Sequence, residues 1–116
     1  MRYLCLIYGD EQKINALPHD ELAAISAECE AYCEGLQQNG KCLASEALQP
    51  TDPATSIRVR NGKVSVTDGP FAETKEQLGG FYLIEAKDLN EAIQIASNIP
   101  PARLGTVEVR PIWEDG

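Results

Sequence analysis

The sequence of 116 residues predicts an α+β fold made of two β-α-β halves with a β-hairpin between them. Three observations predict it. Short apolar runs stand at both ends of each half, and two segments carry apolar residues at helical spacing. Midway along the chain an Asn-Gly pair separates two alternating runs. The length is that of a single domain, residues 1–116, and is sufficient for one buried core.

The first half begins with the run Arg2 to Tyr8, which is apolar on both alternating faces, as in a strand that is buried on both sides. A helix is expected after it, with Pro18 in its first turn and Asn39-Gly40 as its stop signal. Its apolar stripe recurs at spacings of three and four residues: Leu22, Ile25, Cys29, Tyr32 and Leu36. Lys41 to Leu48 reads as the second strand.

The strongest local signal is the segment 57–66, in which Asn61-Gly62 separates two alternating runs. Asn-Gly favours a two-residue hairpin turn because both central residues of that turn have positive φ. The predicted register pairs Arg60 with Lys63. Four β-branched side chains then share one face of the hairpin: Ile57, Val59, Val64 and Val66.

The second half begins with Gly80 to Glu85, another strand that is apolar on both faces. Asp88 followed by Glu91 resembles a capping box, and Pro100-Pro101 prevents the second helix from continuing. Thr106 to Trp113 is the last strand. This order is that of a ferredoxin-like sandwich, with an antiparallel sheet and both helices on one face.

The sheet face away from the helices is expected to carry large apolar side chains, among them Tyr82, Ile84 and half of the first strand. A monomer that exposed such a patch to water would tend to associate. We therefore expect a homodimer in which two sheets stack and enclose a cleft. Trp113 either closes this interface or packs in the core.

Charge and composition limit the partners. The formal net charge is 10 − 18 = −8, which argues against nucleic acid and membrane as partners. The apolar N-terminal run is too short to span a membrane and lacks a cleavage pattern, so a cytoplasmic location with reduced thiols is expected. Cys29 and Cys33 lie one helical turn apart, but packing is favoured over metal binding and over redox chemistry for the cysteines, and no cofactor is expected.

The segment Thr67 to Glu76, TDGPFAETKE, followed by Gly79 to Tyr82, GGFY, resembles the hallmark of the DGPF branch of the YCII-related family. The opening run and the order of helices and strands resemble it too, so the likeness covers nearly the whole chain. It implies a dimeric α/β-barrel of ferredoxin-like units in bacterial cytoplasmic proteins, often associated with extracytoplasmic-function sigma factors, with largely unassigned activity. Related branches use a His-Asp pair, which His19 at the start of the first helix does not reproduce.

Residues 67–76, called the DGPF segment below, group Asp68, Glu73 and Lys75 around the Gly69-Pro70 corner. A carboxyl group enclosed in a dimer cleft is a candidate general acid or base, and a nearby lysine would favour its ionised form or bind an anionic substrate group. Asp68, Glu73 and Lys75 are therefore the candidate catalytic residues. The candidate substrate contacts are Arg58, Tyr82 and Arg110.

The same segment also fits a purely structural role, in which Asp68 caps a turn and Phe71 plugs the core. Thr74 or Glu73 would then cap a short helical turn over residues 75–78. Two functions stay open. One is a cofactor-free small enzyme that performs acid-base chemistry on a small polar molecule in the dimer cleft. The other is a non-enzymatic ligand-binding or regulatory module that acts with a sigma factor. The hairpin is a candidate dimer clamp in either case.

Overall fold

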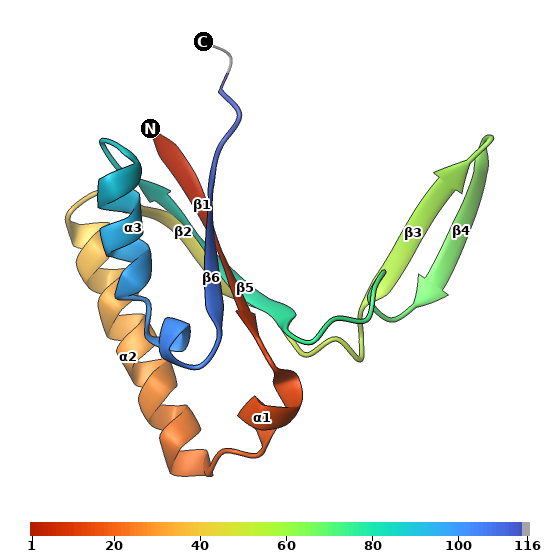
Figure 1. Ribbon diagram of the computed structural model, residues 1–116, viewed down its shortest axis with the longest axis horizontal. Helices are drawn as coiled ribbons and strands as arrows, with labels where there is room; N and C mark the ends of the chain where they lie inside the picture. The colour runs from red at the N-terminus through yellow and green to blue at the C-terminus, as the bar shows by residue number, and fades with distance from the viewer. Residues whose placement is uncertain (115–116) are drawn as a thin grey trace.

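The computed structural model describes residues 1–114. Four strands form an antiparallel sheet in the order β2-β5-β1-β6, and the two longer helices cover one of its faces (Figure 1). The elements are β1 (Arg2–Gly9), α1 (Glu11–Asn15), α2 (His19–Gln38), β2 (Cys42–Ala47), β3 (Thr55–Arg60), β4 (Lys63–Asp68), β5 (Gln77–Glu85), α3 (Leu89–Ser97), the 3-10 helix η1 (Pro100–Arg103) and β6 (Thr106–Pro111). The α+β class is confirmed, and the strand order is compatible with a ferredoxin-like fold. None of the helices in residues 1–114 is long and apolar enough to cross a membrane.

The hairpin β3-β4 has the predicted register, with Arg60 opposite Lys63. Its turn residues Asn61 and Gly62 have φ of 53° and 77°, as a turn with two positive φ values requires. The hairpin forms a sheet of its own and projects away from the rest of the molecule (Figure 1). The radius of gyration is consequently 16.0 Å, whereas a compact chain of this length has about 13 Å.

The core lies between the helices and the inner face of the sheet. Tyr3 and Cys5 of β1 lie opposite Ile84 and Tyr82 of β5, and all four side chains are buried. They pack with helix and loop residues: Leu36, Ala92, Ile95, Ala96 and Ile99. The placement of Tyr82 and Ile84 on the uncovered face was therefore wrong. A strand that is apolar on both faces does not show which of its faces the helices cover.

The uncovered face of the sheet nevertheless carries large apolar side chains. In the pairing of β1 with β5, Leu4 lies opposite Leu83 and Leu6 opposite Phe81, so these side chains alternate with those of the core. All four are half-buried, and they lie on the face of the sheet opposite the core. Trp113 is 90% exposed, which excludes core packing within a single chain.

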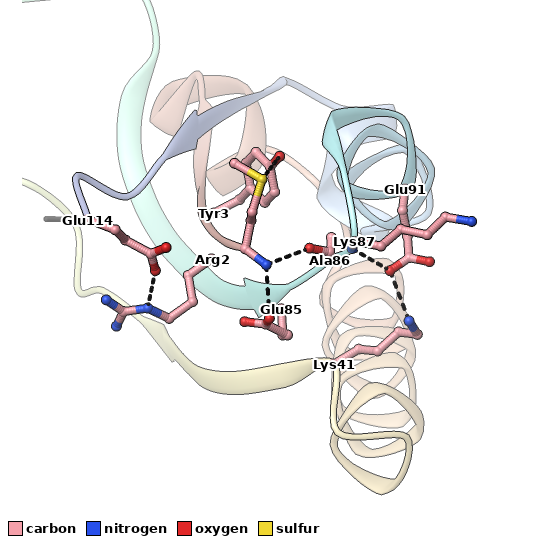
Figure 2. Close-up of polar contacts among 9 residues, drawn as sticks. Arg2, Tyr3, Lys41, Glu85, Ala86, Lys87, Glu91 and Glu114 are labelled. Atoms are coloured by element: carbon pink, nitrogen blue, oxygen red, sulfur yellow. Dashed lines mark hydrogen bonds and ion pairs between the residues drawn. The ribbon is translucent and has the colours of Figure 1, made fainter. Parts of the chain in front are cut away.

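The ends of the helices match the sequence signals in part. Asp88 caps α3, since its Oδ1 accepts the Glu91 N–H at 2.9 Å. The reciprocal half of the capping box is absent, because the Glu91 carboxylate instead accepts the Lys87 N–H and the Lys41 ammonium (Figure 2). The ammonium at 2.9 Å is the main cause that lowers the pKa of Glu91. Pro18 precedes α2 as its cap rather than lying in its first turn.

Strand β5 begins at Gln77, three residues before the predicted start. The short helical turn expected over residues 75–78 is therefore absent. Within β5, Gly80 allows β2 to come close, because a Cβ at that position would lie 2.8 Å from the Glu46 carbonyl oxygen. β6 is an edge strand and ends at Pro111 rather than Trp113.

Candidate functional site

A polar hollow of about 500 Å³ lies at the base of the hairpin, between the end of β4 and the start of β5. Its lining consists of most of the DGPF segment and two residues from outside it: Thr51, Asp68, Gly69, Pro70, Ala72, Glu73, Thr74 and Gln77. Asp68 and Glu73, two of the candidate catalytic residues, thus face the same space. Lys75 is exposed and is not part of this lining.

The corner of the DGPF segment is held by backbone geometry and by hydrogen bonds to β3 and the residue before it. Gly69 has a φ of 98°, in the region that side chains strongly disfavour, so glycine is required there. Its N–H donates to the Ala54 carbonyl oxygen at 2.6 Å, and its carbonyl oxygen accepts the Ser56 hydroxyl at 2.8 Å. Asp68 is consequently fixed at the end of β4, where it pairs with Thr55.

A second network of hydrogen bonds fixes two residues of the lining, Thr51 and Gln77. The Glu11 carboxylate accepts the Thr51 N–H at 2.8 Å and the Thr51 hydroxyl at 2.9 Å. The Glu11 N–H donates to Gln77 Oε1 at 2.9 Å, and Gln77 Nε2 donates to the Thr74 carbonyl oxygen at 2.6 Å. These bonds connect three distant segments of the chain. Sequence reasoning missed Glu11, Thr51 and Gln77, because no motif or spacing relates residues 40 and 66 positions apart.

The carboxylates of Asp68 and Glu73 are exposed, and within residues 1–114 neither has a hydrogen-bond or ion-pair partner. Both are therefore available to a ligand. Ionised carboxylates only accept hydrogen bonds, so two of them in one hollow favour a molecule with several N–H or O–H donors or a positive charge. Phe71, which was expected in the core, is 79% exposed, because the hairpin carries this segment away from the helices.

The three candidate substrate contacts lie elsewhere in the single chain. Arg58 lies on β3 opposite Ser65 and is exposed. Arg110 lies on the uncovered face of β6 and forms an ion pair with Glu108. Tyr82 lies under α2, where its hydroxyl donates to the Cys29 carbonyl oxygen at 3.2 Å and burial raises the pKa of its phenol. The chain thus does not by itself bring these three side chains to Asp68 and Glu73.

In the described part of the chain, no three side chains of histidine, cysteine, aspartate or glutamate form a group that could hold a metal ion. The four cysteines, Cys5, Cys29, Cys33 and Cys42, are free thiols.

Comparisons with known proteins place the whole described chain in one family. Residues 1–114 match the model of the YCII-related domain. A protein of Rhizobium meliloti (strain 1021), described as uncharacterised, is 39% identical over 114 residues, which cover 97% of this chain and 92% of the relative. The match includes both β-α-β halves and the hairpin, so the polar hollow lies within the shared region.

Proposed function

This chain belongs to the YCII-related family, and from its polar hollow we propose that it is a cofactor-free enzyme that exchanges protons with a small polar molecule. The observation that carries the proposal is that Asp68 and Glu73 line one hollow and that neither carboxylate has a partner within residues 1–114. One carboxylate accepts a proton from the bound molecule as general base. Its neighbour, when protonated, returns a proton to another atom of the same molecule.

The hydrogen-bonded surroundings of the hollow suit this role. Thr51 and Gln77 are each fixed by bonds to Glu11, so the part of the lining that they form is ordered before a ligand arrives. Preorganised polar groups lower the cost of ligand binding. We infer that the substrate is an amine, an amino sugar or a polyol, because these classes supply the donors that two carboxylates accept.

We further propose that the active form is a homodimer. Two apolar surfaces support it: the uncovered sheet face, with Leu4, Leu6, Phe81 and Leu83, and the β-branched face of the hairpin. The four side chains of the hairpin face are between 56% and 66% exposed in the single chain. A second copy that covers these surfaces would remove them from water and would enclose the cleft in which the chemistry takes place. Arg58 and Arg110 would enter this cleft as substrate contacts, and Lys75 would enter it beside the two carboxylates.

A thermal-shift screen with small amines, amino sugars and polyols tests the site. A ligand of the hollow should raise the Tm of the wild type and fail to do so with the double variant Asp68→Asn/Glu73→Gln. Asp52→Asn is the matched control, since Asp52 is an exposed acid beside the hollow and outside its lining. The variants themselves should keep the wild-type Tm within about 2 °C, because neither carboxylate has a partner to lose among the described residues. A shift that survives in the double variant contradicts the proposal.

Catalysis is tested separately from binding. Each ligand found in the screen is incubated with the protein in D2O. Proton NMR follows the exchange of its carbon-bound protons for deuterium, or its conversion to another compound. The wild type should increase the rate of exchange or conversion, and each single variant should reduce that rate at least tenfold. Binding without any change in the NMR spectrum would leave a ligand-binding module as the function.

The exposed face of the hairpin favours a second candidate, a regulatory module that contacts an extracytoplasmic-function sigma factor in the bacterial cytoplasm. Apolar patches of this kind often mark contacts between proteins. Immobilised protein should then retain a purified sigma factor of this class, and the retention should disappear with Val59→Asp. Absence of retention by the wild type would reject this candidate and leave the second copy as occupant of the surface.

A further inference from the structure

A second groove, of about 370 Å³, lies between α2 and the strands β2 and β5. Cys29 and Cys33 of α2, Ser45 of β2 and Tyr82 of β5 are among the residues that line it. It shares no lining residue with the polar hollow, so chemistry in this groove does not depend on the proposed function. The groove is open to solvent at a place where two cysteines meet.

The cysteines in contact are Cys33, which is in the lining, and Cys42, which is not. Their sulfur atoms are 3.7 Å apart, which is van der Waals contact, and a disulfide requires about 2.0 Å. Cys33 is half-buried and lines the groove, whereas Cys42 is 6% exposed and lies behind it at the start of β2. A small oxidant that enters the groove therefore meets Cys33 first.

The surroundings also make the two sulfur atoms chemically unequal. The Ser45 hydroxyl lies 3.0 Å from the Cys33 sulfur and can donate a hydrogen bond to a thiolate there. Burial, together with the hydrogen bond to Cys33, raises the pKa of Cys42 to about 11. Cys42 thus keeps its proton at neutral pH, and Cys33 is the sulfur that faces the groove.

We propose that Cys33 and Cys42 form a reversible disulfide when the protein meets hydrogen peroxide. The Cys33 thiolate attacks one peroxide oxygen, the O–O bond breaks, and the products are a Cys33 sulfenic acid and hydroxide. The Cys42 sulfur then attacks the Cys33 sulfur, the S–O bond breaks, and hydroxide leaves with the Cys42 proton as water. The two thiols lose two electrons and peroxide gains them. A dithiol such as dithiothreitol reverses the reaction.

The bond would connect α2 to β2 across the turn at Asn39-Gly40 and would close a loop of ten residues. The other two cysteines are less suited. Cys5 is fully buried, and the Cys29 thiol interacts with the Tyr82 side chain. Because the new link restricts the unfolded chain, the oxidised protein should melt at a Tm several degrees above that of the reduced protein.

Peptide mapping tests the proposal on the wild-type chain. The protein is treated with hydrogen peroxide, remaining thiols are alkylated with N-ethylmaleimide, and trypsin with a glutamate-specific protease separates all four cysteines. Cys33 is then in residues 31–34 and Cys42 in residues 42–46. We expect these two peptides linked, the link lost after dithiothreitol, and Cys5 and Cys29 alkylated.

Two variants test which cysteines are needed for the link. Cys29→Ser should still form the link at the wild-type rate, whereas Cys42→Ser should leave Cys33 oxidised to sulfinic acid with no link. A disulfide between Cys29 and Cys33, a link between two chains, or four alkylated thiols after treatment that oxidises free cysteine would each overturn the proposal. Circular dichroism of Cys42→Ser shows that the variant is folded, and the wild-type mapping decides the question even if it is not.

Discussion

Replacement of Gly69 by alanine tests whether the positive φ at the DGPF corner requires glycine. Gly69 has a φ of 98°, and a Cβ built there meets no atom within 4 Å. The cost of Gly69→Ala is therefore conformational rather than steric. A non-glycine residue pays about 1–2 kcal/mol for a left-handed backbone.

This cost translates into a measurable change in Tm. An unfolding entropy of about 2.1 cal/mol/K per residue gives about 0.24 kcal/mol/K for 116 residues, so Gly69→Ala should lower Tm by about 4–8 °C. Gly35→Ala is the matched control. Gly35 lies inside α2 and its Cβ would also meet no atom within 4 Å. Alanine at position 35 should add about 0.5–1 kcal/mol to the free energy of unfolding and raise Tm by about 2–4 °C.

Thermal unfolding of both variants, followed by far-UV circular dichroism, checks the pair. The same chemical change should act in opposite directions at the two positions. Equal shifts, or no loss of stability in Gly69→Ala, would refute the argument that φ decides the residue at this corner. Ligands found in the screen above should also bind Gly69→Ala less well, because Gly69 is part of the hollow and fixes Asp68 beside it.

Three further predictions concern the interface, pH and packing. Val64→Asp on the exposed hairpin face should convert the proposed homodimer to a monomer in light scattering, whereas Ser65→Asp on the other face of the same strand should not. The Lys41 hydrogen bond lowers the pKa of Glu91 below its ordinary 4.5, so the stabilisation is present above that pH and is lost as pH falls through the lower folded value. In thermal melts, Glu91→Gln should accordingly have a lower Tm than the wild type at pH 7. This difference in Tm should disappear at acidic pH. Gly105→Ala would place a Cβ 2.0 Å from a carbonyl oxygen of β1, and urea unfolding should show a loss of about 3 kcal/mol.

Local signals in the sequence predicted local structure well. The Asn61-Gly62 pair fixes the hairpin register because Asn and Gly both tolerate the positive φ that a type I′ two-residue turn requires. The end of α2 at Gly40, which has a φ of 71°, follows from the same property of glycine. Asp68 and Glu73 face one hollow, because Gly69 turns the chain between them.

Long-range placement could not be predicted in the same way. Tyr82 and Ile84 lie under the helices and not on the open face, and an apolar pattern on both faces of a strand is identical for the two arrangements. Phe71 is exposed because the hairpin does not join the sheet, which no residue of the hairpin indicates. The supports of the hollow, Glu11 and Gln77, are related only by the fold.

Association and ligand binding are coupled in the proposed mechanism, and the coupling can be measured. The polar hollow lies where the hairpin leaves the sheet, so a partner that positions the hairpin also sets the geometry of Asp68. If dimer formation tightens the binding of a ligand by some factor, the ligand must tighten the dimer by the same factor. Val64→Asp should then weaken binding although Val64 is not part of the hollow. Equal ligand affinity in the monomeric variant and the wild type would show that the hollow is complete within one chain.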